Sequence, residues 1–286
     1  MARKHRHKGG AKTSVSANPN RQRNSAGPRR GRPANPAAGS RELWLFGTHA
    51  VEAALRNPKR NVKRLLATPE AAQRLEAKGI GQPALSLLEP ADRSAIELIV
   101  GEEAVHQGVA AHVATLPDLE IEDALGSLGD RETVLLVALD HVTDPHNVGA
   151  IMRSAAAFGA AALIVTKHNA PDETGVLAKS ASGALEHVAL VRATNLSRAI
   201  ETCQQNGFWV VGLDAHGESD IDDLDLPDRC VLVLGAEGEG VRPGVQKVCD
   251  FMARLPMAGT MESLNVSNAG AIALFEWHRQ KRAKKG

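Results

Sequence analysis

The pattern of hydrophobic and polar positions beyond residue 132 alternates between the strand and helix types. Residues 134–139 form a continuous apolar run, which is typical of a strand buried on both faces of a parallel sheet. Residues 147–158 have helical spacing, and Gly159 follows where a left-handed C-cap favours glycine. Further strands are expected at 162–165, 188–191, 208–213, 231–234 and 251–255, with a last helix over 266–281. This order predicts an α/β fold whose sheet is mostly parallel and covered on both faces.

A smaller α/β pattern precedes this region. Strands are expected at 42–46 and 62–67, and helices over 51–57 and 70–78. A short element follows at 96–100, and residues 106–113 alternate toward a strand. We therefore expect a front module over 41–115, an acidic, glycine-containing linker over 116–131, and a larger module over 132–286.

The charge distribution along the chain is strongly asymmetric. Residues 1–40 contain ten Lys or Arg and no Asp or Glu, so the rest of the chain carries −9 against an overall net charge of +1. With almost no branched apolar side chains, this segment is expected to be a disordered basic tail. Its cations favour a polyanionic partner, although a solvated leader that only aids solubility has the same composition.

Other features of the composition restrict the class of protein. The three cysteines, Cys203, Cys230 and Cys249, lack C-x-x-C spacing and nearby histidines, which favours a reducing cytoplasmic setting without a zinc site. No run of 18 apolar residues predicts a membrane span. The aromatic share of 3% argues against a protein that binds single strands by base stacking.

Three polar or glycine-rich segments follow predicted strands of the larger module, where open α/β sheets bind ligands. The first, residues 139–160, reads LDHVTDPHNVGAIMRSAAAFGA. Asn147 suits a helix cap or a ligand contact, and Arg153 lies about two turns into the helix. A lone arginine on an alanine-rich helix is more often an ordinary surface residue.

The second segment, VLVLGAEGEGV over 231–241, has the spacing G-x-x-G-x-G, which is not a dinucleotide fingerprint and lacks a P-loop ending. Alone it could be a tight turn carrying Glu237 and Glu239. The third, RLPMAGTMESLNVSNAGAIALFE over 254–276, gathers Ser263, Asn265 and Ser267 before an apolar helix. N-capping explains one or two of these polar residues but not the whole group.

Together, the three segments resemble the three signature motifs of the SpoU/TrmH family of RNA 2′-O-methyltransferases, within the SPOUT superfamily. The resemblance covers about residues 132–280. In the front module, FGTHAVEAAL and HQGVAAHV resemble the start and end of the L30e-like substrate-binding domain of the RlmB-type ribosomal RNA branch.

The resemblance implies a trefoil-knotted catalytic domain that binds S-adenosylmethionine and works as a homodimer, with the last helix as a dimer element. It implies no metal. Backbone groups of Gly235, Leu255 and Leu264 are expected to hold the cofactor, and the neighbouring Met257, Gly238 and Gly259 are included in that site. The catalytic candidates carried over from the motifs are Arg153, Asn147, Glu237, Ser263 and Asn265.

The implied reaction displaces a methyl group from a sulfonium by a ribose 2′-hydroxyl. Arg153 is expected to favour the alkoxide electrostatically, because a guanidinium is too weak an acid to serve as a general base near neutral pH. The amide and hydroxyl side chains would orient the arginine and the ribose, while Glu237 would fix its loop or pair with a cation.

Only RNA carries a 2′-hydroxyl, so the partner is expected to be RNA, most specifically a guanosine in 23S ribosomal RNA. The front module would recognise RNA shape, with His49 and His106 in structural or RNA-positioning roles. The cluster Arg279, Lys281, Arg282, Lys284 and Lys285 would add affinity for phosphates. Alternatives are a transfer-RNA 2′-O-methyltransferase, a resistance enzyme that modifies its host's ribosome, a catalytically silent assembly factor and, remotely, a nucleotide-dependent oxidoreductase.

Overall fold

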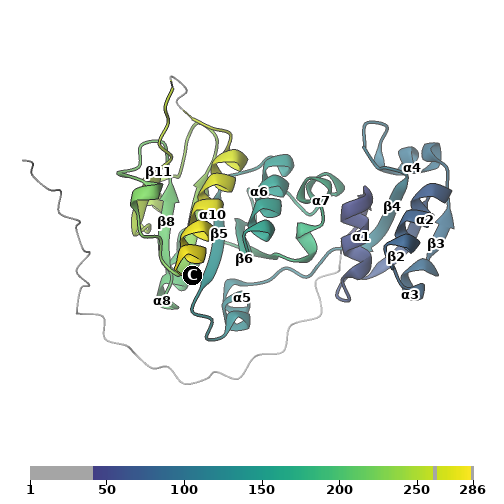
Figure 1. Ribbon diagram of the computed structural model, residues 1–286, viewed down its shortest axis with the longest axis horizontal. Helices are drawn as coiled ribbons and strands as arrows, with labels where there is room; N and C mark the ends of the chain where they lie inside the picture. Colours follow the sequence, from purple (N-terminus) through teal and green to yellow (C-terminus); the bar gives the residue numbers. More distant parts are fainter. Residues whose placement is uncertain (1–40, 260–262, 285–286) are drawn as a thin grey trace, which may run out of the picture. The chain divides into compact units, whose positions relative to one another are not determined.

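The computed structural model describes residues 41–259 and 263–284 (Figure 1). The predicted basic tail, residues 1–40, lies outside the described residues. Among those that are described, no helix combines the length and apolar character needed to cross a membrane.

The front part of the chain forms a four-stranded sheet in the order β1-β4-β2-β3. The strand β4 is central and antiparallel to both of its neighbours. The elements are β1 (Glu42–Phe46), α1 (Thr48–Arg56), β2 (Val62–Ala67), α2 (Pro69–Ala77), α3 (Gln82–Leu85), β3 (Leu88–Pro90), α4 (Arg93–Val100) and β4 (Val109–Ala114). The bounds predicted for β1 and β2 are confirmed, whereas α3 and β3 are too short to give a periodic signal.

The rest of the chain forms a seven-stranded sheet in the order β7-β6-β5-β10-β8-β11-β9, and every pair in it is parallel. Its strands are β5 (Val134–Asp140), β6 (Ala160–Thr166), β7 (Ala189–Ala193), β8 (Trp209–Leu213), β9 (Ser219–Asp220), β10 (Arg229–Gly235) and β11 (Phe251–Arg254). Its helices are α5 (Ile121–Leu128), α6 (Pro145–Ala157), α7 (Gly175–Ala181), α8 (Leu196–Gln205), α9 (Pro243–Gln246) and α10 (Val266–Ala283), with short 3₁₀ turns η1 (Ala184–Glu186) and η2 (Ile221–Asp223).

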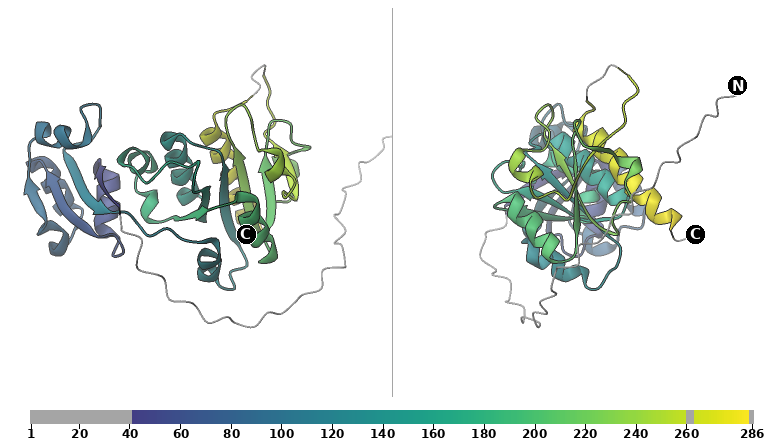
Figure 2. Two further views of the ribbon diagram at one scale, coloured as in Figure 1. Left: turned by 180° about the vertical axis from the view of Figure 1, so that it is seen from behind. Right: turned by 90° about the vertical axis from the view of Figure 1, so that its left-hand side faces the viewer.

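Helices cover both faces of the seven-stranded sheet (Figure 2). Side chains alternate across a strand, so β5 divides its residues between two cores. Leu135, Val137 and Leu139 pack in the cluster that includes residues of α6, α7 and α10. Leu136 and Ala138 pack in the cluster that includes α5 and α8. The predicted α/β class, with a parallel sheet buried on both faces, is confirmed.

The segment 116–131 has more local structure than the acidic linker expected from the sequence. It contains α5, whose residues Ile121, Ala124, Leu125 and Leu128 are buried. Their spacing of i, i+3, i+4 and i+7 is the helical pattern that the acidic residues between them obscure. Leu119 also makes an isolated parallel bridge to Val191, so this segment extends the contacts of the larger sheet.

A buried arginine joins the turn after α1 to the larger module. The Arg60 side chain is fully buried and pairs with Glu173 and Glu186, both at 2.6 Å. It also donates to the Ala114 carbonyl at 2.9 Å. Burial raises the pKa of Glu173, and the adjacent Arg60 opposes that rise. Two carboxylates therefore share one guanidinium at this contact.

Candidate active site

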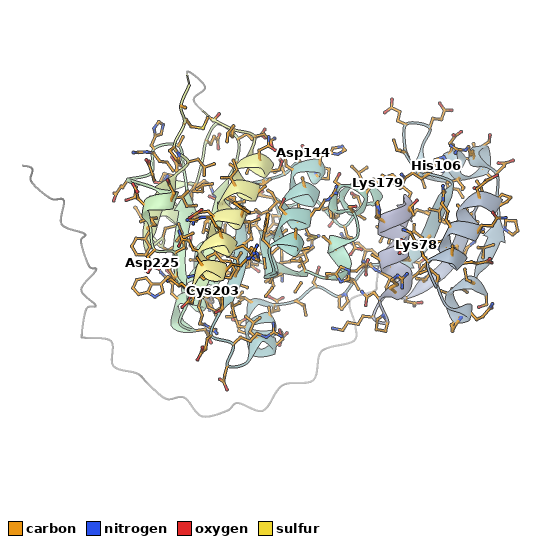
Figure 3. The ribbon with its side chains drawn as sticks, viewed as in Figure 1. Lys78, His106, Asp144, Lys179, Cys203 and Asp225 are labelled. Carbon is orange, nitrogen blue, oxygen red and sulfur yellow. The ribbon has the colours of Figure 1, made fainter. Side chains whose placement is uncertain are left out.

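The first part of the site lies where β5 ends and α6 begins. Asp140 closes the strand, and Asp144 caps the helix by accepting a hydrogen bond from the His146 backbone N–H at 2.9 Å. Figure 3 shows Asp144 at this end of α6. The suggestion that Asn147 caps the helix is therefore wrong. Asn147 lies in the first turn, and its side chain is free to contact other loops.

The loop after β10 folds back on itself so tightly that only glycine fits at its base. A Cβ on Gly235 would lie 2.0 Å from the carbonyl carbon of Gly240. Asp214, beyond β8, accepts a hydrogen bond from the Val241 N–H at 3.2 Å and fixes the returning strand of the loop. This geometry presents Glu237 at the exposed tip of the loop.

The third part of the site is the N-cap of α10. The Asn265 side-chain oxygen accepts hydrogen bonds from the backbone N–H groups of Ser267 at 2.9 Å and Asn268 at 3.4 Å. The Ser267 hydroxyl donates to the same oxygen at 2.5 Å. Capping therefore uses the oxygen of Asn265 and leaves its amide N–H groups to donate elsewhere.

These three segments meet in one hydrogen-bonded group. The Asn265 amide donates to Glu237 at 2.5 Å and to the Asn147 side-chain oxygen at 3.0 Å. The Asn147 amide in turn donates to Glu237 at 3.2 Å. Residues separated by up to 118 positions thus form a triangle of two amides and one carboxylate. Such a group orients hydroxyl ligands without itself reacting.

The other two catalytic candidates are placed differently. Ser263 is exposed and lies two positions before Asn265, the N-cap of α10. Arg153 is exposed on α6, and it has no hydrogen bond or ion pair with any residue in the described ranges. Being six positions beyond Asn147, its Cα is turned well away from that residue around the helix axis. Within one chain, therefore, the structure does not bring Arg153 into the Asn147–Glu237–Asn265 triangle.

The residues expected to hold the cofactor border the same loops. Gly235 is buried, Leu255 is half-buried, and Met257 and Leu264 expose 40% and 37% of their surface. Gly238 is at the loop tip with φ +83°, and open space surrounds the position where its Cβ would be. Gly259 is also exposed. Exposed apolar side chains beside a close backbone turn fit a purine nucleoside with an aliphatic tail.

The basic cluster predicted in α10 is mostly used within the fold. Lys281 is buried and bonds to Asp228 at 2.7 Å, while Arg279 pairs with Glu276 and Lys284 with Asp225, each at 2.7 Å. The predicted phosphate-binding role is wrong for the buried Lys281, whereas Arg279 and Lys284 keep 53% and 51% of their side chains exposed and for them it stays a prediction. Arg282 is exposed, and Lys285 lies outside the described residues.

The two histidines of the front module also differ in environment. His106 is buried, and its Nδ1 accepts a hydrogen bond from the Gly108 N–H at 3.2 Å (Figure 3). This contact supports the structural role that was one of its two predicted roles. His49 is exposed at the start of α1.

Two supporting pairs near the site were not predicted. Asp140 has no exposed side-chain surface, yet it accepts hydrogen bonds from the Arg242 backbone N–H at 2.9 Å and from its Nε at 2.8 Å. Asp214 supports the loop after β10. A carboxylate directly after an apolar strand was the available signal for Asp140, because a buried charge requires a partner.

Family comparisons agree with this geometry. Residues 134–275 match the model of the SpoU rRNA Methylase family. Residues 44–119 match the model described as RNA 2′-O ribose methyltransferase substrate binding.

Similar proteins cover most of the chain. The 23S rRNA (guanosine-2′-O-)-methyltransferase RlmB of Pseudomonas aeruginosa is 43% identical over 241 residues, covering 83% of this chain and 96% of that protein. The SpoU methyltransferase AviRb of Streptomyces viridochromogenes, solved with the cofactor AdoMet, is 29% identical with a TM-score of 0.68, covering 85% and 91% of the two chains. An AdoMet-bound rRNA methyltransferase of Sinorhizobium meliloti is 26% identical with a TM-score of 0.67, covering 84% and 87%.

Proposed function

Because the chain belongs to the SpoU rRNA methylase family, we propose that it transfers a methyl group from S-adenosylmethionine to a ribose 2′-hydroxyl of a guanosine in 23S ribosomal RNA. The observation that carries the proposal is the triangle of Asn147, Glu237 and Asn265, which joins the three motifs in one site. The guanosine and the 23S rRNA are the substrate named for the P. aeruginosa relative.

When bound, S-adenosylmethionine supplies a methyl group on a sulfonium, which is a good leaving group. The backbone at Gly235, Leu255 and Leu264 holds the cofactor, and the apolar side chains of Met257 and Leu264 shield it from water. Gly238 and Gly259 let the two loops approach it closely.

The triangle positions the ribose. Amide donors and acceptors of Asn147 and Asn265 direct the 2′-hydroxyl toward the methyl carbon, which reduces the entropic barrier of the displacement. Glu237 holds both amides in place. Ser263, beside the cap, adds a hydroxyl donor to the same edge. Arg153 favours the developing alkoxide by its positive charge and keeps its own proton, and the proton of the 2′-hydroxyl passes to solvent water beside the exposed Glu237 and Asn265.

A second copy of the chain brings Arg153 to the site. The Arg153 side chain is exposed and unpaired among the described residues, five positions before Phe158, the C-cap of α6. The Phe158 ring contacts Phe275 of α10 with centroids 5.8 Å apart, and Figure 1 shows these helices side by side. Ile272 and Phe275 expose 45% and 51% of their surface, an apolar area suited to a homodimer contact.

The first experiment measures transfer of labelled methyl groups to RNA from cells that lack this gene, with wild type and Arg153→Ala in parallel. The proposal predicts label in large-subunit RNA with wild type and at least a hundredfold less with the variant, the order of loss for a transition-state contact. Label only in transfer RNA would keep the reaction and overturn the substrate. No label in any RNA or ribosomal precursor would reject the enzyme in favour of a silent assembly factor.

A mixing experiment tests the second subunit. Arg153→Ala and Asn265→Ala are each inactive as homodimers, but a mixed dimer has one site with both residues intact. Random exchange of equal amounts should restore about a quarter of wild-type activity, because half of the dimers are mixed and each has one intact site. No recovery after exchange would place Arg153 in its own subunit's site.

We place the enzyme in the cytoplasm, since its three cysteines are free thiols.

A further inference from the structure

A cavity separate from the triangle opens at the same edge of the seven-stranded sheet. It has a volume of about 310 Å³ and is lined by residues that follow β6, β7 and β10. These strands are parallel, so their carboxyl ends share the edge that bears Asn147 and Glu237. The loop after β10 connects the two places, with Glu237 near one end and Arg242 at the other.

Most residues that line this cavity have polar side chains, Leu196 and Val245 are apolar, and none is acidic. Thr166 is 93% buried, since 7% of its surface is exposed, and its hydroxyl has no hydrogen-bond partner in the described parts of the chain. His168 is exposed at the rim. The hydroxyl oxygen is not among the buried side-chain polar atoms that lack a partner, so it is accessible and can form a hydrogen bond with a ligand in the cavity.

The start of α8 adds backbone donors. Asn195 caps the helix by accepting from the Arg198 N–H at 3.1 Å. The N–H groups of Leu196 and Ser197, in the first turn, have no protein acceptor among the described residues and belong to residues that line the cavity. Free N–H groups at the start of a ten-residue helix favour an anionic ligand.

Arg242 provides a positioned guanidinium whose charge is largely balanced. Its Nε and one terminal nitrogen bond to the fully buried Asp140 at 2.8 and 2.6 Å, while 40% of the side chain stays exposed. Because the Asp140 carboxylate offsets the charge of Arg242, the guanidinium serves mainly to direct hydrogen bonds toward a ligand. Such a site suits a singly charged phosphodiester better than a doubly charged free phosphate, which needs more uncompensated cations.

We propose that this cavity binds a backbone phosphate of the substrate RNA, outside the nucleotide that is methylated. The inference rests on the proposed function, because that function supplies the RNA. The cavity then works as a second anchor on the catalytic module itself. The Thr166 hydroxyl, the α8 N–H groups and Arg242 donate to the phosphate oxygens, and His168 covers the rim.

Two substitutions remove the anchor without touching the triangle or the cofactor loops. Thr166→Val removes the hydroxyl at nearly constant volume, and His168→Ala removes the rim donor. His187→Ala is the matched control, because His187 is equally exposed but precedes β7 and therefore lies at the opposite edge of the sheet. RNA affinity is measured by fluorescence anisotropy over a salt series, with S-adenosylmethionine affinity and kcat measured beside it.

We expect the double variant Thr166→Val/His168→Ala to weaken RNA binding three- to tenfold. The slope of log affinity against log salt should stay near the wild-type value, because neither substitution removes a Lys or Arg and Arg242 is kept. Cofactor affinity, kcat and the His187→Ala control should stay at wild-type values. RNA affinity of the double variant within twofold of wild type would overturn the proposal.

A separate arm distinguishes the source of the phosphate. Inorganic phosphate is titrated into the wild type and the double variant. Saturation by millimolar phosphate that the double variant loses, together with unchanged RNA affinity, would assign the cavity to a free anion and reject RNA. Because RNA binding is measured without methyl transfer, failure of the anchor is distinguishable from failure of the proposed reaction, in which wild type itself transfers no label.

Discussion

Asn265 has two functions that substitution can separate. Its oxygen caps α10, and its amide nitrogen donates to Glu237 and Asn147. Asn265→Ala removes both functions. Asn265→Ser keeps a good capping oxygen and removes the donors, and Asn265→Asp keeps the cap but turns an anionic oxygen toward Glu237.

The magnitudes follow from these contacts. Loss of the cap in Asn265→Ala should lower the free energy of unfolding by about 1 kcal/mol, within the range measured for such caps. In Asn265→Asp, a gain of about 0.3–1 kcal/mol from a carboxylate at the helix N-terminus opposes a repulsion from Glu237 of about 1 kcal/mol in an exposed setting. Asn265→Ser and Asn265→Asp should therefore unfold within about 1 kcal/mol of wild type.

The loss of activity should depend on the loss of the Asn265 amide donors and not on the change in the free energy of unfolding. All three variants lose the amide donors, so kcat/KM for methyl transfer should fall by about a hundredfold or more in each. The assay combines urea unfolding with initial rates of transfer to ribosomal RNA. Asp92→Ala, which removes the cap of α4, is the control for lost stability alone and should keep its kcat. More than half of wild-type activity in the Asn265→Ser variant, or activity losses that scale with stability across the series, would show that methyl transfer does not depend on the Asn265 amide donors.

Four further predictions concern the buried groups and the loop after β10. Arg60→Met should destabilise the protein by about 3–5 kcal/mol in chemical denaturation, because it leaves Glu173 and Glu186 buried without their cation; a loss below about 1 kcal/mol would contradict the buried pairing. Burial raises the pKa of Glu173 in the folded protein, so its contribution to stability is present below pH 4.5 and is lost as the pH rises through the raised pKa. Glu173→Gln should therefore flatten this part of the curve of stability against pH. An unchanged curve would contradict a raised pKa of Glu173. Gly235→Ala should abolish cofactor binding in calorimetry, because its Cβ would overlap the backbone of Gly240, and wild-type affinity would disprove that constraint. Burial raises the pKa of each thiol, Cys203, Cys230 and Cys249, to about 12. Iodoacetamide at pH 8 should therefore label the buried Cys203 and Cys230 only after unfolding and the half-buried Cys249 slowly, and rapid labelling of Cys203 or Cys230 in the folded protein would contradict their burial.

The sequence predicted long elements well and short or threaded features poorly. Residues 134–139 could be assigned because a strand buried on both faces has no polar interruption. The helix α5 was obscured by the acidic residues between its apolar positions, and α3 is only one turn long. The knot stays a prediction, because threading leaves no trace in local periodicity.

The residues of the candidate site also differ in whether the sequence predicted them. The motifs allowed Asn147, Glu237 and Asn265 to be grouped before their contacts were known, although Asn147 was also considered as a cap. Charge counting misjudged Lys281, because it is buried and pairs with Asp228 more than 50 positions away along the chain. The Asp140–Arg242 pair depends on contacts over 102 positions, which composition cannot reveal.

Transfer of the methyl group to a ribose 2′-hydroxyl is tested most directly by finding the position of the methyl group in ribosomal RNA. Large-subunit RNA labelled by the wild-type enzyme is hydrolysed in alkali, which cleaves RNA only where a free 2′-hydroxyl can attack the neighbouring phosphate. We expect the label to stay in an alkali-resistant dinucleotide whose 5′ nucleoside is guanosine. Label released in single nucleotides would show methylation of a base, and would contradict a site built to direct a ribose hydroxyl.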